Sequence, residues 1–214
     1  MGDLSTDFSP ELYREYWTGW LKDRTDFRDY RYAHTRPDSK SRVDLRKWFP
    51  PPYDQGRTNT CVAQAIAGMA EYFSNRGFIP QTFRPSRLFI YWVGRVATGV
   101  NPRKDIGMSI RGGMKGVTRY GLASESRWPW DPEKVNHEPP ITAYSNAPKT
   151  LIVRYERLPV SVDAVKHALQ NDFPVIAGFK VYSSYYSYYA YATGVIPVPR
   201  EGELWRGGHA VLIV

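Results

Sequence analysis

The chain has 214 residues, 42% of them hydrophobic and 15% aromatic, a composition that excludes disorder and allows one compact domain or two lobes. The formal net charge is +8, but acids alternate with bases between Lys22 and Lys47, so the pattern does not indicate a nucleic-acid site. A single cysteine excludes an internal disulfide, and neither a signal peptide nor a membrane span is evident, so we expect the cytoplasm or another reducing compartment.

An N-terminal extension is expected over residues 1–47. Ser9, Pro10 and Glu11 have the order of an N-cap, a first-turn proline and a first-turn acid. Apolar residues then recur at helical spacing and predict an amphipathic helix near residues 10–21: Leu12, Tyr13, Tyr16, Trp17, Trp20 and Leu21. The charged, irregular sequence that follows predicts a connector that runs over the surface.

A helical lobe is expected over residues 48–130. Apolar spacing predicts a buried helix that starts at Cys61, with Asn59 or Thr60 as its N-cap. A second helix is predicted from Ser86. A third is predicted from Ser109 to Tyr120, where the following glycine ends it.

Residues 131–214 predict a β lobe that follows a loop-like stretch at 131–149. A short helix is predicted between the first two strands, from Ser161 to Gln170, and the six tyrosines between Tyr182 and Tyr191 predict an ordered aromatic loop. Runs of β-branched and aromatic residues predict four strands: Thr150–Leu158, Pro174–Tyr182, Val195–Val198 and His209–Val214.

The chemistry centres on Cys61. Gln55 lies six residues before it, and His209 lies 148 residues after it at the start of an apolar run. A lone cysteine with a distant histidine is typical of a nucleophile and its base. A helix N-terminus and an imidazolium would both favour the thiolate, so the sequence predicts a lowered Cys61 pKa. The alternative is that Cys61 is a small buried hydrophobe.

These motifs resemble the papain-like cysteine peptidases, and in particular a disulfide-free branch found in bacteria and large viruses. The family resemblance rests on Gln55-Gly56, the interval to Cys61 and the histidine that starts an apolar run. The resemblance to the branch spans roughly residues 25–214 and rests on the order of short segments, among them Arg28-Asp29-Tyr30, Trp128-Pro129-Trp130 and Gly207-Gly208-His209-Ala210-Val211. It implies an α+β fold with a helical lobe, an antiparallel β lobe and an active-site groove between them. It also implies a peptide or protein substrate.

The resemblance assigns a role to each site residue. Cys61 is the expected nucleophile, His209 the base and later acid, and Gln55 an oxyanion-hole donor together with the Cys61 backbone N–H. Three residues are expected to contact the substrate: Asn59, Gly107 and Gly208. No metal-ligand spacing and no glycine-rich phosphate loop occurs, so no metal or cofactor is expected. The sequence does not indicate an oligomeric state.

One departure from the family concerns the histidine. The family orients this histidine with an asparagine farther along the chain, whereas the sequence ends at Val214. We therefore expect a C-terminally truncated peptidase with an incomplete β lobe that hydrolyses peptides poorly. Two alternatives remain open, a catalytically impaired papain-like module that binds peptides and a bacterial wall amidase.

Overall fold

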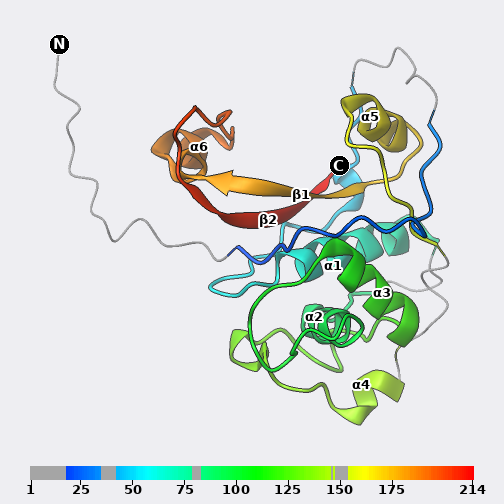
Figure 1. Cartoon of the computed structure of the whole chain (residues 1–214). Helices are drawn as coiled ribbons and strands as arrows, with labels where there is room; N and C mark the ends of the chain where they lie inside the picture. Colours follow the sequence, from blue (N-terminus) through cyan, green and yellow to red (C-terminus); the bar gives the residue numbers. More distant parts are fainter. Residues whose placement is uncertain (1–17, 35–41, 79–82, 146, 148–153) are drawn as a thin grey trace.

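The computed structural model describes residues 18–34, 42–78, 83–145, 147 and 154–214. Four helices lie on one side and a two-stranded sheet with two further helices lies on the other (Figure 1). Helices followed by an antiparallel sheet confirm the α+β prediction. The α-helices are α1 (Cys61–Asn75), α2 (Arg87–Val96), α3 (Ile110–Tyr120), α4 (Ile141–Ser145), α5 (Val162–Gln170) and α6 (Tyr188–Thr193), the 3-10 helices are η2 (Arg46–Trp48), η3 (Pro132–Lys134) and η4 (Ser183–Tyr186), and the strands are β1 (Val175–Tyr182) and β2 (Trp205–Ile213).

The predicted helices of the first half are confirmed at their ends. Ser86 and Ser109 are the N-caps of α2 and α3, and their hydroxyls accept hydrogen bonds from backbone N–H groups of the first turn. Gly121 ends α3 with φ +84°, a backbone angle that favours glycine. Helices α2 and α3 pack backbone to backbone, because a Cβ on Gly116 would lie 2.5 Å from the Gly94 nitrogen.

The sheet pairs β1 with β2 in an antiparallel register that sets Gly178 opposite Ala210 and Phe179 opposite His209. Two of the four predicted strands are thus confirmed, although β2 begins earlier, at Trp205. Strand β2 packs against α1, which joins the two halves of the molecule through one core.

The other strand predictions have different outcomes. Residues 195–198 form no strand, because Pro197 has no backbone N–H to contribute to a ladder. The predicted strand at 150–158 lies partly outside the described residues; its remainder makes one isolated bridge, from Arg157 to Arg31. The tyrosine-rich stretch is helical rather than a loop, since it forms η4 and α6, and Ser187 caps the second of these.

The predicted N-terminal helix lies outside the described residues as far as residue 17. The part that is described, residues 18–21, is extended and makes a parallel bridge from Trp20 to Met108. We call residues 18–21 the strap. The helix predicted from the apolar spacing does not form here, because the strap's backbone groups pair with neighbouring segments instead of with one another. Figure 1 shows this segment, in dark blue, passing between the sheet and α1.

Beyond the strap the chain is anchored on the N-terminal end of α3. The backbone N–H of Arg111 donates to Asp23 at 3.1 Å, and its guanidinium donates to Asp29 and to the Arg24 carbonyl. These contacts hold the segment across the surface, as expected of a connector.

Candidate active site

Cys61 is the first residue of α1, and its placement depends on the loop that precedes it. Gly56 has φ +56°, and its N–H donates to Asp54 at 2.7 Å. Gln55 donates its amide to the Thr58 carbonyl at 2.6 Å, while the Thr58 hydroxyl donates to the Gln55 carbonyl at 2.7 Å. This reciprocal pair holds the Gln55 side chain against its own loop, with the amide on the Thr58 carbonyl.

Strand β2 brings the C-terminal histidine motif to Cys61. The backbone N–H of Ala210 lies near the Cys61 thiol, where it lowers the thiol pKa, and both residues belong to the same core. His209 immediately precedes Ala210 in the sequence. Its half-buried ring lies against Phe179 and Tyr185, at centroid distances of 5.8 Å and 6.2 Å. Two motifs far apart in the sequence are therefore adjacent in the fold.

The strap lies directly over Cys61. Met108 pairs with it on one side: its N–H donates to the Gly19 carbonyl at 2.9 Å, and its carbonyl accepts from Leu21 at 3.1 Å. On the other side the Trp20 N–H donates to the Gly208 carbonyl at 3.0 Å. The Gly19 N–H lies near the Cys61 thiol, where it lowers the thiol pKa. Cys61 is only 2% exposed beneath the strap and β2.

The surface that the strap contacts is built around residues without side chains, and we call it the groove. A Cβ on Gly19 would lie 1.9 Å from the Asn59 carbonyl oxygen, and one on Gly107 would lie 2.2 Å from the Gly19 carbonyl oxygen. The Trp20 indole occupies the space where Gly178 and Gly208 lack a Cβ, at 2.1 Å and 2.8 Å. An extended backbone fits here only because these positions are glycine.

All three residues predicted to contact substrate, Asn59, Gly107 and Gly208, therefore touch the strap. Their role toward a substrate stays a prediction. Met108, whose N–H and carbonyl both pair with the strap, is a further residue of the groove that the sequence does not indicate. Trp20, which has helical spacing in the sequence, lies in the strap and not in a helix. No side-chain pattern marks a residue that acts through its backbone, so no signal for Met108 was available.

Burial shifts the pKa values of both Cys61 and His209. It raises the pKa of the Cys61 thiol, and the nearby backbone N–H groups of Ala210 and Gly19 oppose this only in part. Burial likewise lowers the pKa of His209. The prediction of a lowered Cys61 pKa is wrong for this strap-covered state, because the strap excludes the water that would solvate a thiolate.

The lowered pKa of His209 predicts an acid-sensitive fold. The unfolded chain takes up this proton at about pH 6.5, before the folded chain does, so the free energy of unfolding should fall as pH drops below that value. Urea unfolding between pH 7.5 and 5.5 measures the slope. The His209→Gln variant should show a shallower slope, and equal slopes would mean that His209 is solvated in the fold.

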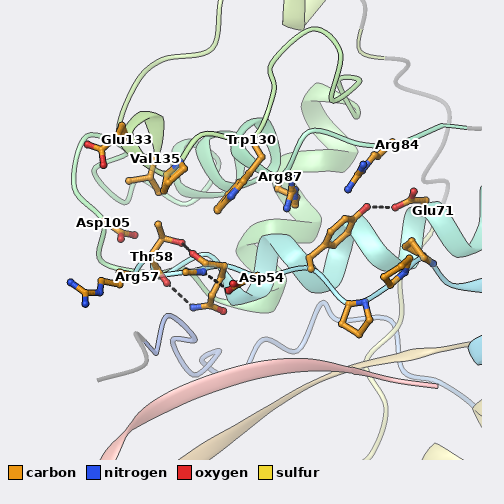
Figure 2. Close-up of a pocket in the computed structure, with 17 residues that line it drawn as sticks. Asp54, Arg57, Thr58, Glu71, Arg84, Arg87, Asp105, Trp130, Glu133 and Val135 are labelled. Carbon is orange, nitrogen blue, oxygen red and sulfur yellow. Dashed lines mark hydrogen bonds between the residues drawn. The ribbon is translucent and has the colours of Figure 1, made fainter. Parts of the chain in front are cut away.

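A separate cavity of about 840 Å³ lies behind the Cys61 loop, and Gln55, Tyr53 and Trp130 are among the residues that line it (Figure 2). Neither Cys61 nor His209 lines this cavity, so it is distinct from the groove. In the described part of the chain, no three His, Cys, Asp or Glu side chains gather as metal ligands. No helix among the same residues is long and apolar enough to cross a membrane.

Comparison with known proteins supports one assignment. The chain is 36% identical to an uncharacterized peptidase C1-like protein of Acanthamoeba polyphaga mimivirus, over 80% of this chain and 59% of that protein. Xylellain, a cysteine protease from Xylella fastidiosa, superposes with a TM-score of 0.77 at 30% identity, over 92% of this chain and 79% of that one. Procathepsin B S9 from Trypanosoma congolense superposes with a TM-score of 0.65 at 17% identity, over 92% and 70%. No protein-family model matches the chain.

The helices, the antiparallel sheet and the thiol beneath an extended peptide segment define a papain-like α+β protein. The chain belongs to the papain-like cysteine peptidase family. This confirms the family and the fold that the sequence motifs predicted.

Proposed function

We propose that this chain carries a cysteine peptidase site that hydrolyses peptide bonds through a thioester, with Cys61 as nucleophile and His209 as base and acid. One observation carries the proposal. The groove over Cys61 already holds an extended peptide, the strap, by backbone hydrogen bonds to Met108 and Gly208. A surface that binds one extended backbone through backbone groups is suited to bind others, since such bonds do not depend on side chains.

The reaction starts when a substrate replaces the strap. His209 takes the thiol proton, and the Cys61 sulfur attacks the substrate carbonyl carbon to form a carbon–sulfur bond. The Cys61 N–H and the Gln55 amide stabilise the oxyanion. Collapse breaks the carbon–nitrogen bond, and His209 gives its proton to the leaving amine. Water then attacks the thioester carbon while His209 takes a proton from it, the carbon–sulfur bond breaks to release the carboxylic acid product, and His209 returns its proton to the Cys61 thiolate.

The Gln55 role predicts an asymmetric defect. In a background with the strap displaced by Gly19→Ala, Gln55→Ala should lower peptide turnover about 10²-fold, because acylation develops an oxyanion. Iodoacetamide alkylation of Cys61 develops none and should stay within about threefold. Stopped assays of both reactions on the same preparation make the comparison.

His209→Ala serves as the contrasting variant because it should slow both reactions. Equal losses on Gln55→Ala would mean that Gln55 only shapes the loop, through its exchange of hydrogen bonds with Thr58. Alkylation that does not depend on His209, with peptide binding retained, would favour the peptide-binding module over the peptidase.

A further inference from the structure

Asp105 connects the loop that precedes Cys61 to the segment between α2 and α3. Its carboxylate accepts from the Asn59 backbone N–H at 3.1 Å and 3.0 Å, one distance to each oxygen. The Asn59 side-chain amide donates to the Asp105 carbonyl at 2.7 Å. Figure 2 shows Asp105 at the same end of the cavity as Thr58, next to this loop. The loop and the segment are therefore held together at one residue pair.

Tyr91 extends this connection to the opposite side of the groove. Its hydroxyl donates to the Asp105 carboxylate at 2.6 Å and accepts from the Gly107 N–H at 2.9 Å. The Tyr91 side chain is fully buried in α2, with the Arg95 guanidinium 3.7 Å from its ring centroid. Arg95 is also fully buried; burial lowers the pKa of its guanidinium, and the electrostatic effects of Tyr91 and Asp105 oppose that shift. The hydroxyl is thus fixed from both sides.

The two residues held in this way are the walls of the groove. Asn59 and Gly107 both approach the strap at Gly19, since a Cβ on Gly19 would meet the first and a Cβ on Gly107 would meet the Gly19 carbonyl. The distance between the walls therefore decides whether an extended backbone fits. With one cysteine in the chain, no internal disulfide is available to set that distance.

We infer that Asp105, together with Tyr91, is a positioning residue that sets the separation of the groove walls and so holds an extended peptide in place over Cys61. The effect on the strap follows from the hydrogen bonds alone. The effect on a substrate rests in addition on the function proposed above.

Hydrogen exchange of the strap tests the first effect in the full chain. The amides of Trp20, Leu21 and Met108 donate across the groove, so their protection reports whether the walls keep their separation. Asp105→Asn removes one acceptor, and Tyr91→Phe removes the hydroxyl between the walls. Each should lower the protection of these amides about tenfold, while α5 amides keep theirs.

Two control variants make the same chemical changes at positions away from the groove. Tyr72→Phe removes a hydroxyl from another fully buried tyrosine, one that donates to the Asp172 carbonyl at 2.9 Å and accepts from Arg76. Asp163→Asn repeats the aspartate-to-asparagine change on the exposed first turn of α5. Neither should alter strap protection. If Tyr91→Phe leaves the protection of the strap amides unchanged, or lowers that protection no more than Tyr72→Phe does, the inference is wrong. If Asp105→Asn does not fold, the result for Tyr91→Phe decides the test.

A peptide chloromethyl ketone tests the effect on substrate, in the Gly19→Ala background. Asp105→Asn and Tyr91→Phe should raise the concentration for half-maximal inactivation of Cys61 about tenfold, with a smaller change in the iodoacetamide rate. A general structural role would slow both reagents alike and would overturn the inference. If the reactivity of Cys61 does not depend on His209, the proposed peptidase function is contradicted. The hydrogen-exchange result would still test the effect of Asp105 and Tyr91 on the strap, because that effect does not depend on catalysis.

Discussion

Gly19→Ala should raise the rate of Cys61 alkylation by iodoacetamide about 10²-fold. The added Cβ would lie 1.9 Å from the Asn59 carbonyl oxygen, a backbone atom that cannot rotate away, so the strap cannot keep its place. Leaving the groove costs three backbone hydrogen bonds, each worth about 1 kcal/mol, so the closed state is favoured by about 3 kcal/mol. That difference corresponds to about 10²-fold in accessibility of the thiol.

Leu21→Ala is the matched control, because it changes an exposed side chain of the same strap and leaves the backbone free to pair. Its alkylation rate should equal that of the unaltered chain. An unchanged rate in Gly19→Ala would show that reagents reach Cys61 by another route. The released thiol should also titrate at lower pH than in the intact chain, because water then solvates the thiolate that burial now disfavours.

Gly116→Ala should lower the free energy of unfolding by about 1 kcal/mol, the difference between a clash and a gain in helix propensity. Alanine is the better helix former by about 1 kcal/mol, which alone would stabilise α3. The new Cβ would, however, lie 2.5 Å and 2.6 Å from the nitrogen and Cα of Gly94 in α2. Forcing two packed helices apart costs about 1–3 kcal/mol and sometimes more, so the clash outweighs the propensity. Urea unfolding measures the net change in the free energy of unfolding from both effects.

Gly68→Ala makes the same change in α1 without the clash. Its nearest neighbour would be a Leu212 side-chain carbon at 3.4 Å, an ordinary contact, so propensity should dominate and stabilise the chain by up to about 1 kcal/mol. We expect the free energy of unfolding to fall in Gly116→Ala and to rise in Gly68→Ala. A stabilising Gly116→Ala would mean that α2 and α3 can separate at little cost.

Local signals in the sequence were sufficient for the helices near the site. Ser86 and Ser109 cap their helices through side chains that reach only into the next turn, and Gly121 ends α3 through its own backbone angle. Such features depend on a few neighbouring residues, and for that reason they can be read from one sequence. The prediction at residues 195–198 failed because it gave the apolar residues more weight than the proline among them.

The sequence by itself determined the helices α1, α2, α3 and α5 and the motifs that distinguish the family: the glutamine, the cysteine that begins α1 and the histidine in β2. Tertiary structure alone decided the state of the thiol. Trp20 has helical spacing, yet the backbone groups of Met108 and Gly208 pair with the strap and hold it extended over Cys61. Hydrogen bonds between backbone groups so far apart leave no pattern in the side chains, and the desolvation that raises the Cys61 pKa follows from them.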